Sequence, residues 1–111
     1  MLIVINVITR KQIEVAENDL ERKMSWNGAI ISAKELGEGW RLPTDNELKQ
    51  MCIQLYEKGK GNFKNDDYYW GCIKENEFSD HRRIFFFNKG GGVGTYRNMW
   101  MSSYVRLVRD F

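Results

Sequence analysis

Two helical patterns follow one another in the first half of the chain, with no strand pattern between them. In the first, apolar residues recur at helical spacing behind Ser25, a favoured N-cap residue, and the pattern closes on Gly37. In the second, Thr44 and Glu47 form a capping-box signature, and apolar positions continue to Tyr56. Two consecutive helices are not the crossovers of βαβ units, so this order favours an α+β fold with an antiparallel sheet.

The predicted strands lie on both sides of these helices. Two short strands precede the helices, at 2–7 and 12–16, and three follow them, at 68–73, 83–88 and 104–108. The length of 111 residues is that of one ordinary domain. We therefore predict a single α+β domain over residues 1–111, in which two helices pack on a small antiparallel sheet.

Charge is distributed unevenly along the chain, although the net charge is only +2. Residues 1–80 hold 11 basic and 14 acidic side chains, whereas residues 81–111 hold 6 basic side chains and 1 acidic one. Such a basic segment can attract polyanions if its arginines share one face. The alternative is that these arginines are solvated or pair with the acidic part of the chain. The sequence contains no apolar run of membrane-spanning length, and its apolar start lacks the charged region and cleavage site of a signal peptide.

Two cysteines, Cys52 and Cys72, are too few for a disulfide-rich scaffold. His81 has no metal-ligand spacing to them, so neither a metal site nor another cofactor is predicted. Cys52 falls on the apolar stripe of the second helix, which favours a buried thiol, with a single disulfide as the alternative.

A distinct motif, Gly-Trp-Arg-Leu-Pro-Thr, occupies residues 39–44 and is followed by Glu47. Ser-Trp-Asn-Gly-Ala precedes it at 25–29, Tyr-Trp follows at 69–70, and the chain closes on Val-Arg-Leu-Val-Arg-Asp at 105–110. Together these segments resemble the Lcl C-terminal domain family, found at the end of bacterial collagen-like adhesins and often described only as a domain of unknown function. We expect structural roles for Trp26, Trp40, Arg41, Leu42, Pro43, Thr44, Glu47, Trp70, Arg106 and Arg109.

The resemblance implies a C-type-lectin-like fold, related to the sulfatase-modifying-factor domains. In such folds the first and last strands pair, two helices flank the sheet, and an irregular loop region binds ligands. Members are often extracytoplasmic, on cell-surface or phage proteins. This sequence shows neither a collagen-like region nor a leader, so its compartment stays open.

The candidate binding region is a glycine-rich stretch at 89–94 and the residues after it. The stretch lacks the Gly-Lys-Ser/Thr ending of a phosphate loop, so we interpret it as a flexible hairpin or as the tip of a binding loop. Aromatic, arginine and asparagine side chains on such a loop suit recognition of a protein or a glycan, although Trp100 could instead belong to the core. The candidate ligand-binding residues are Arg82, Arg83, Lys89, Tyr96, Arg97, Asn98 and Trp100.

We predict a non-catalytic domain that recognises a protein or a glycan, with anionic glycans among the candidates, and not nucleic acid. No nucleophile–base pair is evident, because His81 has only polar neighbours. The acidic stretch 65–67 is interpreted as a solvated loop, since the calcium-binding motifs of sugar-binding lectins are missing. One alternative is a structural or assembly module of a phage or surface complex that forms homo-oligomers through Phe85, Phe86 and Phe87. Another is a degenerate relative of the formylglycine-generating oxidases.

Overall fold

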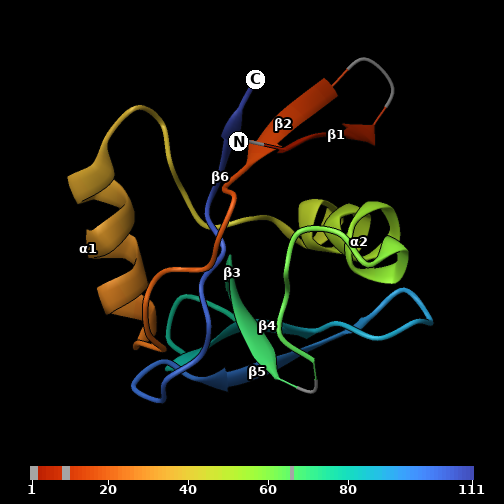
Figure 1. Ribbon diagram of the computed structural model, residues 1–111. Coiled ribbons are helices and arrows are strands. Elements are labelled where there is room, and N and C mark those ends of the chain that lie inside the picture. The colour runs from red at the N-terminus through yellow and green to blue at the C-terminus, as the bar shows by residue number, and fades with distance from the viewer. Residues whose placement is uncertain (1–2, 9–10, 66) are drawn as a thin grey trace.

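The fold consists of two small antiparallel sheets and two helices (Figure 1). The computed structural model describes residues 3–8, 11–65 and 67–111. Figure 1 shows one sheet at the top and the other at the bottom of the molecule, with α1 on the left and α2 on the right. The predicted α+β class is therefore confirmed. No helix in these described ranges is long and apolar enough to cross a membrane.

The first sheet contains both ends of the described chain. It is formed by β1 (Ile3–Ile8), β2 (Lys11–Val15) and β6 (Val108–Asp110), in the order β1-β2-β6. The expected direct pairing of the first and last strands is wrong, because β2 lies between them. Only two residues separate β1 from β2 in the sequence, so β1 takes the nearer edge of β2 as its hairpin partner. The other edge of β2 is left for β6, where Val15 pairs with Val108.

The second sheet is formed by β3 (Tyr68–Lys74), β4 (His81–Phe86) and β5 (Val93–Asn98). The first two correspond to predicted strands, but β5 was expected to be part of a loop. Six residue pairs, from His81–Asn98 to Phe86–Val93, join β4 to β5. The correction has a physical reason: the glycines at 90–92 form the turn, and the chain after them is free to pair with the exposed edge of β4.

The predicted strand at 104–108 is also displaced, since the regular strand is Val108–Asp110. Residues 103–107 form an extended segment that bonds to several neighbours in turn. The Ala16 N–H donates to the Leu107 carbonyl, the Leu20 N–H to the Val105 carbonyl, and the Trp70 N–H to the Tyr104 carbonyl, each at 2.9–3.0 Å. This segment therefore ties the two sheets together.

Both helices begin where the sequence predicts. α1 (Trp26–Leu36) starts behind Ser25, whose hydroxyl accepts from the Gly28 N–H, and the Gly37 N–H closes its last turn. α2 (Asp45–Gln54) starts with the complete capping box of Thr44 and Glu47. A short 3-10 turn, η1 (Tyr56–Lys58), follows α2 and ends at Gly59, whose φ of 69° favours glycine.

The buried side chains form two clusters. The first cluster joins the first sheet, α2 and the aromatic side chains Tyr69, Phe85 and Phe87. The second cluster packs α1 against the second sheet around Trp26 and Trp70. Each indole N–H is satisfied inside the protein: that of Trp26 donates to the Gly71 carbonyl at 2.9 Å, and that of Trp70 to the Met24 carbonyl at 2.8 Å. The two tryptophans thus fix α1 and the segment before it to β3.

Candidate functional site

The segment between the helices is held by a buried carboxylate. Glu47 is 1% exposed, and each of its oxygens accepts a 2.7 Å hydrogen bond from the Arg41 guanidinium. One of these oxygens also accepts from the Thr44 N–H at 2.8 Å. Burial raises the pKa of Glu47, but the bonds from Arg41 and Thr44 outweigh it, so the net pKa is lowered. Arg41 also donates to Asp110 at 2.9 Å, which links this segment to the last strand.

The two arginines near the C-terminus also make structural contacts. Arg106 is fully buried, and its Nε donates to the Asp19 carboxylate at 2.8 Å, while its guanidinium lies over the Phe63 ring. Arg109 is half-buried, pairs with Glu14 at 2.9 Å, and has its guanidinium carbon 4.5 Å from the Trp40 ring centroid. These contacts, together with the burial of Leu42 and Pro43, place the motif residues in interactions that hold the fold together.

Two of the predicted ligand-binding arginines are already engaged. Arg82 is buried against the Trp26 ring, and its guanidinium donates to the Ser79 carbonyl at 2.7 Å. Its Nε is buried and finds no hydrogen-bond partner in the described part of the chain. Arg83 lies on the opposite face of β4 and pairs with Asp45 at the start of α2, at 3.0 Å. Arg82 and Arg83 therefore do not share a face, because successive strand residues point to opposite faces, and the condition for a common polyanion-attracting surface is not met by this pair.

Three further candidates lie at opposite ends of the second sheet. Lys89 is exposed beyond the end where Phe86 pairs with Val93, whereas Asn98 and Trp100 lie at the end where His81 pairs with Asn98. At about 3.3 Å per residue, the two ends are roughly 17 Å apart. The predicted residues do not converge on one site.

Tyr96 and Arg97 occupy the strand between these ends. The Tyr96 ring lies beside the Arg83 guanidinium, 5.0 Å from centroid to carbon, on the face toward α2. Arg97 is on the other face, where its guanidinium lies over Tyr68 and donates to the Ser103 hydroxyl. Both side chains are half-buried, so neither is free as it would be on a mobile loop.

An apolar surface is exposed at the Trp100 end of the sheet. Three large side chains are exposed there: Phe78 is 94% exposed, Trp100 is 64% exposed and Met101 is 48% exposed. They belong to the turns 75–80 and 99–102, which are joined by a 2.8 Å hydrogen bond from the Met99 N–H to the Asp80 carbonyl. Trp100 therefore does not belong to the core, where Met99 lies instead. We call Phe78, Trp100 and Met101 the turn surface; Phe78 in an otherwise polar turn was the signal that sequence reasoning missed.

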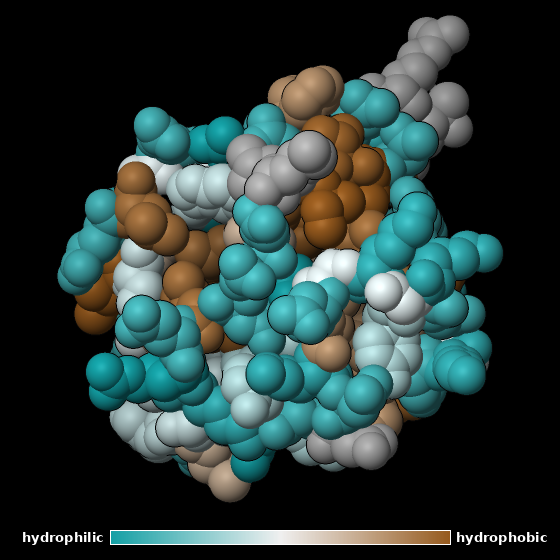
Figure 2. Space-filling model, viewed as in Figure 1, coloured by the Kyte–Doolittle hydropathy of each residue, from teal (hydrophilic) through white to brown (hydrophobic). Residues whose placement is uncertain are grey.

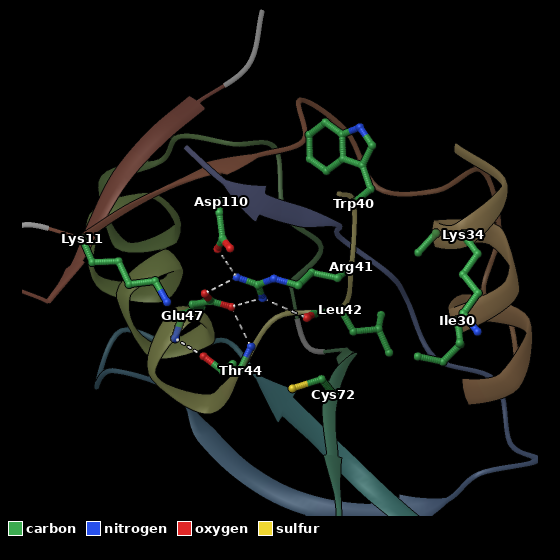
Figure 3. A pocket seen from close by; sticks show the side chains of 11 residues that line it. Lys11, Ile30, Lys34, Trp40, Arg41, Leu42, Thr44, Glu47, Cys72 and Asp110 are labelled. Carbon is green, nitrogen blue, oxygen red and sulfur yellow. Dashed lines mark hydrogen bonds and ion pairs between the residues drawn. The ribbon is translucent and has the colours of Figure 1, made fainter. Parts of the chain in front are cut away.

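A groove of about 500 Å³ lies between α1 and the segment 40–44 (Figure 3). Its apolar walls come from Ile30 and Ala33 on α1 and from Leu42 and Cys72 opposite. Figure 3 shows Ile30 pointing from α1 toward Leu42 and the Lys34 side chain running along α1 toward Ile30, whereas Arg41 points away from α1 toward Glu47 and Asp110. We call this the α1 groove. Sequence reasoning could not find it, because its lining comes from five separate segments.

The two cysteines are both free, so the disulfide alternative is wrong. Cys52 lies in the first buried cluster and Cys72 packs against the second, which keeps the thiols apart. Burial raises the pKa of both thiols, the opposite of what an activated cysteine needs. The oxidase-like alternative gains no support from them.

Metal ligands do not gather in the part of the chain that the structure covers: no group of three or more histidine, cysteine or acidic side chains occurs there. In the acidic stretch 65–67, Asp66 lies outside the described residues. Asp67 pairs with Lys23 at 2.8 Å.

Exposed apolar residues also lie on α1. Figure 2 shows hydrophobic side chains gathered over α1, where Ile31 and Leu36 are each 55% exposed. The proposed oligomerisation surface of Phe85, Phe86 and Phe87 is not available, because Phe85 and Phe87 are buried and Phe86 is half-buried against Tyr68. Successive residues of the strand point to opposite faces, so Phe85 and Phe87, two positions apart, both enter the first cluster.

Comparison of the chain with family models, with curated proteins and with solved structures finds no match. The likeness to the Lcl C-terminal domain family therefore stays a prediction, and the candidate sites are argued from their geometry alone.

Proposed function

We propose that this protein is a non-catalytic recognition domain that binds a protein partner through the turn surface. The observation that carries the proposal is the exposure of Phe78, Trp100 and Met101 on two adjacent turns. Tryptophan and other large apolar side chains, when exposed together, mark interaction sites more often than isolated apolar residues do. Their transfer out of water on binding supplies the main driving force for association.

The charges around this surface favour a protein over an anionic glycan. The turn 75–80 carries three carboxylates, Glu75, Glu77 and Asp80, which repel a polyanion. Arg82 is buried and Arg83 is paired with Asp45, so neither offers its guanidinium to a ligand at this surface. A partner with an apolar pocket surrounded by lysine or arginine side chains complements this arrangement.

The turns are held in place by their own polar side chains. The Trp100 N–H donates to the Asn98 side chain at 2.9 Å, and the Phe78 N–H donates to the Asn76 side chain at the same distance. The Ser79 hydroxyl accepts from the His81 N–H, also at 2.9 Å. A surface whose backbone is already ordered loses less entropy on binding, which suits a recognition role.

The test is selection of random dodecapeptides displayed on phage against the immobilised protein. The expected peptides combine aromatic or aliphatic residues with lysine or arginine, and they lose at least tenfold in affinity for Trp100→Ala. Phe111→Ala is the matched control, because Phe111 is also an exposed aromatic residue, 72% exposed, but lies at the C-terminus away from these turns (Figure 1).

Enriched peptides that bind Trp100→Ala as well as the wild type would overturn the proposal, as would failure to enrich any peptide above scrambled sequences. Retention on heparin-agarose beyond that on a sulfonate resin of equal charge density tests the polyanion alternative. Heparin-specific retention that Lys89→Ala abolishes and Trp100→Ala leaves unchanged would place an anionic glycan ahead of a protein.

A further inference from the structure

We propose that the α1 groove binds a small amphipathic carboxylate, with an apolar body between α1 and Leu42 and its carboxylate at Lys34. This second site is separate from the turn surface and does not depend on the function proposed above. Its volume of about 500 Å³ lies within the range of ligand pockets.

The walls of the groove fit an apolar body. Ile30 and Ala33 are three positions apart on α1 and therefore share one face, which looks across the groove at Leu42 and Cys72. Trp40 contributes an indole wall, and Arg109 stacks on its ring at 4.5 Å and holds it in place. These walls are built from hydrocarbon, sulfur and an indole, so an apolar chain or ring placed there is removed from water.

The charges of the groove select an anion. Its two carboxylates, Glu47 and Asp110, both bind Arg41, whose single positive charge offsets one of their two negative charges. Lys11 lies on the same side of the groove as these carboxylates (Figure 3) and, together with Arg41, lowers the pKa of Asp110, so its positive charge offsets the second negative charge. Lys34 is the remaining cationic side chain of the groove, and no ion pair or hydrogen bond involves its ammonium in the part of the chain that the structure covers.

The position of Lys34 decides where the two parts of the ligand lie. Lys34 follows Ala33 directly and stands one helical turn after Ile30, and its side chain runs along α1 so that the ammonium lies beside Ile30, at the edge of the apolar wall (Figure 3). A carboxylate at Lys34 leaves its attached chain directed toward Leu42 and Cys72. An amine in the same place would meet the unpaired lysine, which excludes a cationic amphiphile.

The experiment uses decanoate as the probe, with decylamine and decanol as its cationic and neutral counterparts. Binding is followed by titration calorimetry, and occupancy by the rate at which N-ethylmaleimide alkylates Cys72, resolved from buried Cys52 by peptide mass. Saturating decanoate is expected to slow alkylation of Cys72 at least threefold and decylamine to leave it unchanged. Decanol is expected to bind more weakly than decanoate.

Two variants locate the contacts. Lys34→Gln is expected to weaken decanoate binding about fivefold, the size of one partly exposed ion pair. Ile30→Gln keeps the bulk of the side chain but places an amide on the apolar wall, and should weaken decanoate and decanol alike. Lys49→Gln is the matched control, because Lys49 is an exposed lysine on α2 that does not line the groove.

The proposal is overturned if decanoate does not bind at millimolar concentration, if decylamine protects Cys72 equally, or if Lys34→Gln binds decanoate as the wild type does. Trp100→Ala is expected to bind decanoate normally, so failure at the turn surface and failure at the groove are told apart.

Discussion

Replacing Glu47 by glutamine tests how much the buried carboxylate between the helices stabilises the fold. The substitution keeps the shape of the side chain and one acceptor oxygen. The new amide nitrogen, however, faces the Arg41 guanidinium, so a donor meets a donor where a 2.7 Å bond existed. The negative charge that compensates Arg41 inside the protein is lost as well.

The size of the effect follows from burial. A hydrogen bond to a charged group contributes about 1.5–3 kcal/mol, and breaking a fully buried ion pair costs about 3–5 kcal/mol. Glu47 is buried, but the Arg41 side chain is 33% exposed and keeps Asp110 as a partner, so the cost falls below the fully buried case. We expect Glu47→Gln to lower the free energy of unfolding by about 2–3 kcal/mol.

The control is the second carboxylate on the same arginine. Asp110 has a side chain that is 73% exposed, so Asp110→Asn is expected to cost at most about 1 kcal/mol. Urea unfolding at neutral pH, followed by circular dichroism, measures both variants, and an unchanged slope with urea concentration shows that only stability has changed. If Asp110→Asn costs as much as Glu47→Gln, burial does not determine the strength of the cluster and the reasoning is refuted.

Two further predictions concern buried charge. Because the folded state lowers the pKa of Glu47 below its ordinary value of 4.5, the stabilisation is fully present above that value and is lost as the pH falls through the folded-state pKa. The urea midpoint should therefore decrease less between pH 6 and pH 3 in Glu47→Gln than in the wild type. An equal decrease in both proteins would contradict a lowered pKa of Glu47 in the folded state. Asp19→Asn leaves buried Arg106 without its anion and is expected to cost about 3–5 kcal/mol in the same assay, with partial recovery in the double variant with Arg106→Met; a cost under about 1 kcal/mol would contradict this.

Local signals predicted the helices well. Ser25, Thr44 and Glu47 make the capping contacts that their spacing indicates, because such bonds join residues only three positions apart. The apolar stripes behind them likewise placed Cys52 in the core. In these segments the contacts that decide the structure lie within one helical turn, so the sequence displays them directly.

The candidate binding site was predicted less well. The glycines before Val93 suggested a loop, yet β5 begins there, because the edge of β4 offers hydrogen-bond partners that a local pattern does not show. Arg82 looked like a surface cation and is buried against Trp26, 56 positions earlier in the chain. Trp100, one of the candidates, is exposed, but Phe78, which is exposed on the adjacent turn, was not among them.

The sequence by itself determined an α+β domain with two capped helices, flanking strands and an aromatic core. Only the tertiary structure decided that β2 separates the terminal strands, that Arg41 binds Glu47 and Asp110 together, and that α1 leaves a groove beside Leu42. The physical reason is range. Caps and amphipathic stripes act between neighbours along the chain, whereas strand order depends on which edges remain free. The fate of each charged side chain depends on which distant groups replace its water.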